Sequence, residues 1–541
     1  MILNKIAFFL LLAVFFLAGC SKRETPVEEG IRKQILHFGN NAEPQNLDPQ
    51  TATGGAEFYI LAALFEGLVS EDPQDGHPVP GVAEKWDISG DGKVYTFHLR
   101  RKAKWSNGDP LTAHDFLKSY QRIFSSNLRS EICGLLFPVK NAEAYYKGDI
   151  SDFNEVGFKA LDDFTFQVTL TYPTPYFLTL ITLVPWFPVH LPTIEKYGKI
   201  DDRENRWTRP GRFIGNGPFI LSEWKINQVI VVKKNPNYWD RDQVRLQEIR
   251  FYPIESPDTE ERAFRSGQLH ITNKIPFSKI DVYRQKTPEL LRIDPFLGTY
   301  LYIINVTKPI LENKKVRQAL SIAVDRKSIV EKITRGGEQP AYSFTPPDTG
   351  GYTARAQIPM DIEIAKKLLA EAGYPNGKGF PPLEILFNTS ENHKTIAEAI
   401  QQMWKKNLNI EVQLVNQEFK VFLETRRQKN YQICREVGWT GDYMDPSTFL
   451  DVFMTTGHNN YTGWSNPEYD RLIDQTIRIG NPQERLELFQ KAEAILLDES
   501  PIIPIYFYTR PYLMHPSVKG WYPVYVNNRP YKYVYLESTR K

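Results

Sequence analysis

The 541-residue chain is too long for one ordinary hydrophobic core, and its length predicts two to four domains. Hydrophobic residues make up 41% and charged residues 24%, a balance typical of globular proteins, so we expect disorder only near the ends. The aromatic share of 13% is enough to line a ligand cleft. A formal net charge of +2 gives no strongly basic balance, which argues against nucleic acid as a partner.

The N-terminus carries a predicted export signal. Lys5 precedes an apolar run over residues 6–18, and this run is shorter than the roughly 20 residues that a membrane-spanning helix needs. The run ends in Leu-Ala-Gly-Cys, which resembles the bacterial lipobox with Cys20 as the lipid acceptor. We therefore expect a signal peptide over residues 1–19 and a lipidated N-terminus with a flexible tether over 20–34, where the sequence KRETPVEEG is charged and contains a Pro.

Hydrophobic periodicity predicts short strands and helices in the first half of the chain. A strand near Ile35, a loop and a helix over residues 57–66 come first. Thr112 and Asp115 have the spacing of a capping box, so a helix begins there and continues through Tyr120. Apolar or alternating runs bounded by turn residues predict further strands. These strands lie at residues 94–99, 164–170, 219–224 and 229–232.

After Pro295 the predicted helices and strands alternate. Apolar stripes at helical spacing predict helices over residues 316–324, 362–372 and 396–408. Apolar runs predict strands over residues 383–387, 410–415 and 501–508. The last of these is aromatic and flanked by Pro, and we expect it to return across the molecule. The alternation indicates a mixed α/β lobe.

The sequence lacks the motifs of the common enzyme chemistries. It contains no His-Glu-x-x-His, Walker A, Gly-x-Gly-x-x-Gly or Gly-x-Ser-x-Gly run, and its nine His are dispersed. Cys133 and Cys434 have no Cys partner at zinc-site spacing, so we expect no metal and no cofactor. We expect both to be unpaired buried thiols, and a Cys133–Cys434 disulfide stays the alternative. We predict that the protein is not an enzyme. A glycosidase carboxylate pair stays an alternative, because 64 acidic residues give no pattern against one.

Three stretches carry a resemblance to a known family. PGVAEKW at 80–86, VYTFHLR at 94–100 and AKWSNGDPLTAHDF at 103–116 resemble the signature region of the family 5 extracellular solute-binding proteins, which serve peptide and nickel importers. Matching segments continue in the same order over essentially all of the mature chain. They lie at 160–166, 216–219, 235–239, 316–320, 342–347 and 365–373. The stretches 387–394 and 416–426 are most similar to the oligopeptide-binding branch of the family.

The resemblance implies an α/β fold of the type II periplasmic-binding-protein kind. Two lobes are joined by a hinge of two crossing strands, and the first lobe carries an extra inserted sub-domain. Such lobes close around a ligand by a hinge motion. We expect lobe I to comprise residues 35–65, 188–297 and 510–541, the inserted sub-domain 66–187, and lobe II 298–509.

The resemblance assigns the α-ammonium group of a bound peptide to Asp442. Every linear peptide has an α-ammonium group, a regular backbone and a carboxylate, so a receptor that tolerates many sequences must read those features. The loop GWTGDY at residues 438–443 matches the family's ammonium-binding loop and includes Trp439 and Thr440. Between closed lobes, such a charge pair gains strength from the low dielectric. The alternative is that Asp442 only shapes a Gly-Asp turn.

Other positions match peptide contacts of the family, each by a weaker signal. Those expected at the peptide backbone are Asn459, Tyr508, Asn273, Gly54 and Gly55, and those expected near the carboxylate are His393 and Arg435. Asn459 could equally be a turn residue and Tyr508 a core aromatic, and His393 could be a solvated residue near a helix start.

The sequence also departs from the family pattern. An acidic group of the relatives is absent near Thr53, a Lys of theirs falls near Thr334, and a disulfide beside their pocket is absent because Gly298 and Thr440 replace its two Cys. One extra residue separates Arg435 from the Gly-Trp pair, which leaves its direction open. We expect a pocket that is less acidic and less covalently constrained.

The function implied by the resemblance is that of a substrate-binding lipoprotein of an ABC peptide importer. The expected partners are short peptides, the importer's permease subunits and a membrane reached through Cys20, with the protein a monomer in the cell envelope, at its periplasmic or extracellular face. The same module could instead bind murein peptide, a dipeptide or glutathione. Nickel or haem is disfavoured because no ligand cluster is apparent. An adhesin or an envelope enzyme is an alternative of another class.

Overall fold

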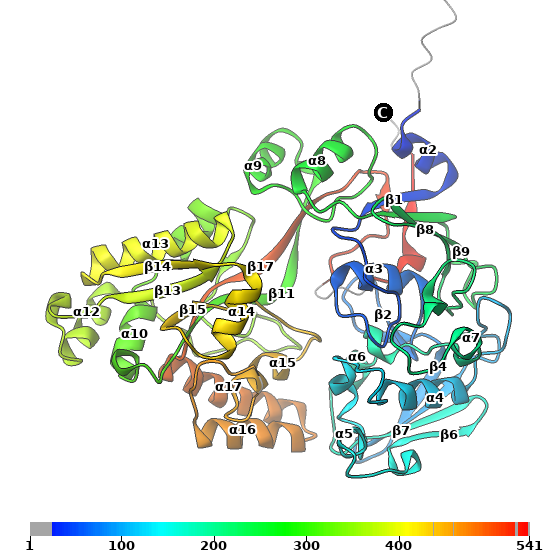
Figure 1. Ribbon diagram of the computed structural model, residues 1–541, viewed down its shortest axis with the longest axis horizontal. Coiled ribbons are helices and arrows are strands. Elements are labelled where there is room, and N and C mark those ends of the chain that lie inside the picture. Colours follow the sequence, from blue (N-terminus) through cyan, green and yellow to red (C-terminus); the bar gives the residue numbers. More distant parts are fainter. Residues whose placement is uncertain (1–23, 437, 458, 525–528, 539–541) are drawn as a thin grey trace, which may run out of the picture.

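A computed structural model describes residues 24–541 except 437, 458, 525–528 and 539–541, and it shows two lobes joined by long strands (Figure 1). The predicted signal peptide and Cys20 lie outside the described residues. Among the residues that are described, no helix is both long and apolar enough to cross a bilayer. The expected two-lobe α/β fold is therefore confirmed for the body of the chain.

Lobe I is built on a four-stranded sheet whose spatial order is β1, β10, β9, β8. Its strands are β1 (Ile35–Gly39), β8 (Phe219–Lys225), β9 (Val229–Lys234) and β10 (Glu248–Tyr252), with a small pair β18 (Val518–Lys519) and β19 (Tyr535–Leu536). Its helices are α2 (Pro26–Lys33), α3 (Gly55–Leu64), α7 (Leu191–Tyr197), α8 (Pro257–Arg265) and α9 (Phe277–Lys286). The strands predicted at 219–224 and 229–232 are confirmed as β8 and β9.

The inserted sub-domain contains a second four-stranded sheet in the order β4, β5, β7, β6. Its strands are β2 (Val69–Glu71), β3 (Pro78–Pro80), β4 (Ala83–Ile88), β5 (Val94–Leu99), β6 (Phe158–Asp162) and β7 (Thr165–Thr169), and its helices are α4 (Ala113–Ile123), α5 (Ala142–Lys147) and α6 (Phe177–Leu180). The capping box of Thr112 and Asp115 begins α4 as predicted. One continuous apolar core joins the sub-domain to lobe I, so the two form a single packed body.

Lobe II contains the seven-stranded sheet, in the order β12, β17, β11, β15, β13, β14, with β16 paired to β11. Its strands are β11 (Leu291–Ile304), β12 (Gln339–Pro340), β13 (Leu383–Asn388), β14 (Val412–Gln417), β15 (Ile433–Arg435), β16 (Trp439–Thr440) and β17 (Ile502–Leu513). Its helices are α10 (Lys314–Ile322), α11 (Arg326–Ile329), α12 (Ile362–Glu371), α13 (Glu391–Leu408), α14 (Phe419–Arg427), α15 (Ser447–Leu450), α16 (Pro467–Arg478) and α17 (Pro482–Glu499).

Side chains of β11 alternate between two cores because successive residues of a strand point to opposite faces. Tyr300 and Tyr302 join the core under α10, α12 and α13, whereas Leu301 and Ile303 join the core under α15, α16 and α17. A strand covered on both faces reads as a continuous apolar run rather than an alternating one. This explains why residues 297–304 are all buried.

The hinge consists of β11 and β17, which pair antiparallel from Leu291 opposite Leu513 to Ile303 opposite Ile502. Their register shifts between Pro295 and Thr299, where the strands leave lobe I and enter lobe II. The strand predicted at 501–508 is thus confirmed as a return crossing, and it is longer than expected. Both strands run between the lobes in Figure 1.

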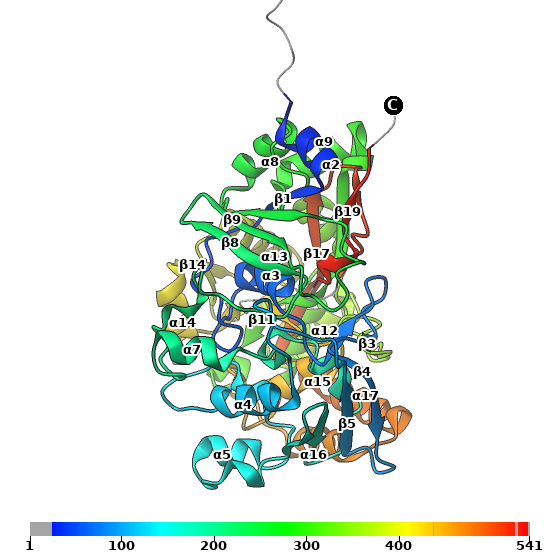
Figure 2. The same cartoon turned by 90° about the vertical axis from the view of Figure 1, so that its right-hand side faces the viewer.

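The predicted flexible tether is wrong from residue 26 onward, where α2 forms. Thr25 caps this helix through a capping box with Glu28, and Pro26 occupies its first turn. Val27 is buried and its amide donates to the carbonyl oxygen of Gly267 at 3.0 Å. In both views α2 lies at the end of lobe I that carries α8 and α9 (Figures 1 and 2). The chain is therefore fixed to lobe I nine residues earlier than the sequence indicated.

Candidate ligand-binding cleft

A cavity of about 240 Å³ lies at the boundary of the two lobes. Lobe I contributes residues at the start of α3, the sub-domain contributes two short segments, the hinge strand β11 contributes Phe296, and lobe II contributes the end of β16 and the loop after it. These residues are Thr53, Gly55, Phe58, Ile132, Leu135, Leu183, Val184, Pro185, Phe296, Thr440, Gly441 and Asp442. Larger hollows lie over residues 308–432 of lobe II and over residues 115–201 around α4 and α5. Neither of those brings the two lobes together. A hollow between Asp72, Thr179 and Tyr443 does, but it is much smaller, at about 30 Å³. The cavity of about 240 Å³ is therefore the candidate ligand site.

Asp442 lies in the cavity wall on a loop that short contacts fix in place. Strand β16 before it pairs with β11, where Thr440 faces Gly298. The Trp439 indole donates to the carbonyl oxygen of Thr448 at 2.6 Å, and the Asp442 amide donates to the Thr448 hydroxyl at 3.1 Å. These bonds hold the backbone and leave the carboxylate of Asp442 available to a ligand.

Asp442 is an exposed residue that lines the cavity. Its side chain contacts the cavity, and the protein around it displaces water, which raises its pKa above the usual range. No described Lys, Arg or His forms an ion pair with it. A charged group that is partly desolvated and lacks a protein cation is suited to receive a cation from a ligand.

Tyr508 lies directly against the Asp442 loop. A Cβ atom on Gly298 would be 3.0 Å from the Tyr508 ring, and one on Gly438 would overlap the Tyr508 hydroxyl. Gly438 also has φ +98°, a backbone conformation that favours glycine. The structure therefore brings together Tyr508, Trp439 and Thr440 at the edge of lobe II. It also makes Gly298 and Thr440 direct strand neighbours, as the resemblance implies for the two Cys of the relatives.

Tyr300 links two of the positions expected near a peptide carboxylate. The Tyr300 hydroxyl lies 3.2 Å from Nδ1 of His393, and the Arg435 guanidinium lies 5.3 Å from the centre of the Tyr300 ring. Arg435 is buried and donates to the Asn388 side chain at 2.8 Å. Burial, and secondarily the charge of Arg435, lowers the pKa of His393 to about 3, so this imidazole is neutral at physiological pH.

The sequence indicated neither Tyr300 nor Asn388 as a site residue. Tyr300 is surrounded by apolar residues in a buried strand, and its role as a link between His393 and Arg435 depends on the pairing of β11 with β15. The direction of Arg435, which the sequence left open, is toward Asn388 and Tyr300 within lobe II.

The remaining predicted positions lie apart from the cavity or at its border. Gly55 lines it, and Gly54 is the N-cap of α3. Asn273 does not line the cavity. Its backbone amide donates to the buried carboxylate of Glu260 at 2.7 Å. Asn459 occupies an exposed turn, and the residues that line the cavity do not include it.

A second contact between the lobes lies next to Asp442. Tyr443 of lobe II stacks on Tyr176 of the sub-domain with ring centres 4.9 Å apart and planes 6° from parallel. The Arg485 guanidinium lies 5.1 Å from the centre of the Tyr176 ring, and Asp445 accepts two hydrogen bonds from Arg485. We call Tyr176 and Tyr443 the interlobe tyrosine stack. It connects the Asp442 loop mechanically to the opposite side of the cleft.

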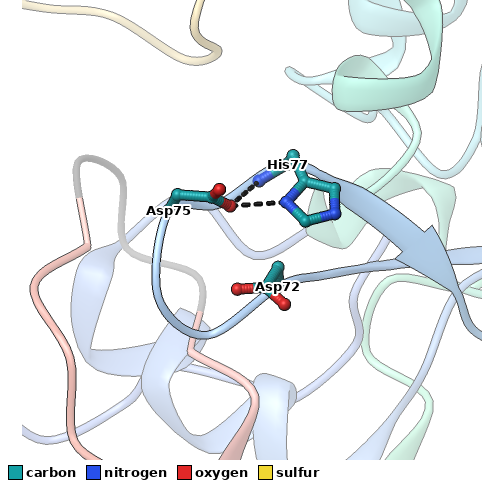
Figure 3. A group of neighbouring side chains, drawn as sticks. All are labelled: Asp72, Asp75 and His77. Atoms are coloured by element: carbon teal, nitrogen blue, oxygen red, sulfur yellow. Dashed lines mark hydrogen bonds and ion pairs between the residues drawn. The ribbon is translucent and has the colours of Figure 1, made fainter.

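One group of potential metal ligands lies in the turn between β2 and β3, where Asp72, Asp75 and His77 come close together (Figure 3). Asp75 accepts a hydrogen bond from the His77 amide at 3.0 Å and contacts the His77 ring at 2.5 Å. Asp72 accepts from the Gln74 amide at 2.8 Å. These bonds are the ordinary side-chain-to-backbone bonds of an Asp-rich turn. The group therefore explains the turn and gives no further sign of a metal.

Cys133 and Cys434 are both buried and unpaired, which confirms the expectation of two free thiols. Burial raises the pKa of each thiol, so neither resembles a reactive cysteine.

Two lobes, a two-strand hinge and a recess between the lobes define a two-lobed ligand-binding protein. Residues 77–461 match the model of the bacterial extracellular solute-binding proteins, family 5. The chain belongs to this family.

Known relatives cover nearly the whole chain. It is 39% identical to the periplasmic oligopeptide-binding protein OppA of Salmonella typhimurium over 517 residues, which cover 94% of this chain and 92% of OppA. The unliganded open form of the murein tripeptide-binding protein MppA superposes with a TM-score of 0.79 at 36% identity, covering 93% of this chain and 97% of MppA. OppA of Haemophilus influenzae in complex with the peptide RPPGFSPFR gives a TM-score of 0.75 at 34% identity, covering 94% and 99%.

Proposed function

We propose that this protein is the substrate-binding lipoprotein of an ABC importer and binds short oligopeptides between its lobes. The carboxylate of Asp442, which lines the interlobe cavity and forms no ion pair with a described protein cation, is the observation that carries this proposal. The α-ammonium group of a peptide has a pKa of about 7.7 to 8.0 and is mostly charged at neutral pH. When the lobes close, the two charges interact in a drier and less polarisable surrounding than in water.

Recognition of the peptide backbone would use the edge of β16. This strand pairs with β11 on one side, and among the described strands none pairs with its other edge. An extended peptide can add to such an edge through main-chain hydrogen bonds, which supply affinity without reading side chains. Tyr508 lies against the same loop, and Gly54, Gly55, Asn273 and Asn459 are proposed to contact longer ligands as the lobes close.

Arg435 and His393 would act at the carboxylate end of the peptide. A buried guanidinium provides a fixed positive charge, and the neutral imidazole of His393 provides a hydrogen-bonding nitrogen beside it. Both belong to lobe II, as does Asp442, so the lobe that holds the ammonium group would also hold the carboxylate.

A murein peptide is the second candidate ligand, and the likeness to MppA favours it specifically. Asp442 fits any ligand with a free α-amino group, so that residue alone does not separate nutrient peptides from murein peptides, dipeptides or glutathione. The proposed site has no catalytic role. The mature chain would be a monomer attached to a membrane through lipid on Cys20 and would deliver its ligand to permease subunits in the cell envelope.

The function is tested by two measurements. Mass spectrometry of small molecules released from the purified protein should identify short peptides. After refolding without ligand, tripeptides to pentapeptides should raise the melting temperature because they bind the native state alone, whereas their N-acetylated forms should have little effect. If only N-acetylated peptides or metals stabilise the protein, the assignment of Asp442 is wrong.

The anchor needs a separate test. Cys20→Ser should abolish incorporation of labelled fatty acid and release the protein from membranes, while leaving peptide binding unchanged. Continued labelling of the variant would contradict the proposed lipid site.

A further inference from the structure

The cavity beside Asp442 is lined mainly by apolar side chains, although its ligand must carry a positive charge. Phe58 comes from α3, Leu135 and Leu183 come from two loops of the sub-domain, and Phe296 comes from β11. All four are half-buried, so each retains apolar surface within the body of the protein. Asp442 is the one charged residue among the twelve that line the cavity.

We propose that this cavity receives the side chain of the first residue of the peptide and selects a large apolar one, such as Leu or Phe. The inference rests on the proposed function and specifies the substrate class of the same site. The α-ammonium group and the first side chain are attached to one carbon atom of the peptide. An ammonium group held by Asp442 therefore places that side chain in the same recess, against Phe58, Leu135 and Phe296.

Apolar contact favours a large hydrophobic group there, because the group and the walls both leave water when the lobes close. A volume of about 240 Å³ leaves room for a leucyl or phenylalanyl side chain. An alanyl side chain would cover less of the walls and leave a void, which costs contacts on both sides.

The charges of the site disfavour Lys or Arg at the first position. Asp442 provides a single carboxylate, and the peptide ammonium group uses it. Thr53, which also lines the cavity, supplies a hydroxyl but no second negative charge. A second cation would thus lose water without gaining a counter-charge.

The test is a calorimetric titration of the ligand-free protein with tripeptides of the form X-Ala-Ala. We expect the peptides with Leu or Phe first to bind at least about tenfold more tightly than those with Ala or Lys first, since burial of one such side chain corresponds to that factor or more. Equal affinities within about threefold across the series would overturn this inference but leave the proposed function standing. If no peptide of the series or of other lengths binds, the proposed function itself fails.

Variants of the wall give an independent readout. In Leu135→Ala the affinity ratio between Leu-Ala-Ala and Ala-Ala-Ala should narrow, and in Thr53→Glu the affinity for Lys-Ala-Ala should rise relative to Leu-Ala-Ala. Leu161→Ala removes a leucine of the sub-domain that is 54% exposed and does not line the cavity, and it serves as the matched control. If each wall variant keeps the wild-type affinity ratio and melts at the same temperature as the control, the cavity does not hold the first side chain of the peptide.

Discussion

Replacement of Asp442 by Asn removes the charge that the peptide ammonium group would meet while keeping the size of the side chain. The loop should survive, because its fixed bonds involve the Asp442 backbone amide and the Trp439 indole rather than the carboxylate. In the closed cleft, truncation of one partner of a hydrogen-bonded charge pair costs about 2 to 5 kcal/mol. The dissociation constant should therefore rise by a factor of roughly 30 to 5,000.

In the ligand-free protein, Asp442→Asn should not be harmful, because there the charge of Asp442 lowers stability. The pKa of Asp442 is raised in the native state by desolvation, so the native state binds its proton more tightly than the unfolded state does. Ionisation of Asp442 therefore lowers stability as the pH rises through the raised native pKa. Asp442→Asn removes this loss, and the melting temperature of the empty protein at pH 7 should stay the same or increase slightly.

Calorimetric titration with a tripeptide and with its N-acetylated form separates the two effects. The wild type should prefer the free tripeptide strongly, and Asp442→Asn should bind both forms with similar weak affinity. A variant that keeps the full preference for the free N-terminus would refute the reasoning, since the ammonium group would then be held elsewhere. A variant that melts far below the wild type would show instead that the carboxylate supports the fold.

Further predictions concern the lobe contact, a buried carboxylate and the thiols. Tyr443→Ala should remove the interlobe tyrosine stack and with it about 0.5 to 1.5 kcal/mol of stabilisation, beyond the effect of the lost buried area. Peptide binding should weaken. If the peptide affinity and the molecular dimensions measured by X-ray scattering both stay unchanged, the stack has no role in lobe closure. Burial raises the pKa of Glu260 to about 7, so the free energy of unfolding should fall as the pH rises from about 4.5 to 7. Glu260→Gln should flatten this pH dependence. If the variant keeps the same pH dependence, other groups cause the loss of stability. In a Cys20→Ser background, Cys133 and Cys434 should resist a thiol reagent in the native state and both react in denaturant; fast native labelling would contradict their burial.

The contacts of Glu260 explain why its substitution should also affect the segment at Asn273, which is proposed to contact longer peptides. Its two carboxylate oxygens accept from the amides of Asn273 and Lys274 at 2.7 and 3.1 Å. Gln supplies only one acceptor oxygen there and presents an NH₂ group to the second amide. The segment at Asn273 should loosen, and affinity for longer peptides should fall more than affinity for tripeptides.

Several elements could be predicted from local sequence because their signals are local. The β5 strand has strict alternation, and α4 begins at a capping box that forms as expected. Helix α2 was predicted as a tether although Thr25, Pro26 and Glu28 are a readable helix start; its charge content suggested solvent instead. Helices α16 and α17 each begin with an Asn cap followed by Pro, a start signal of the same kind that is independent of hydrophobic periodicity.

The amino-acid sequence by itself determined the family, many of the strands and helices, and the loop that carries Asp442, because each depends on residues close together in the chain. Only the tertiary structure decided which distant residues share the cleft. Phe58, Leu135, Phe296 and Asp442 meet because β11 and β17 set the two lobes face to face, and Tyr300 joins His393 to Arg435 because strand register places them on neighbouring elements. Such contacts arise from packing between segments that lie far apart in the sequence, which no local pattern records.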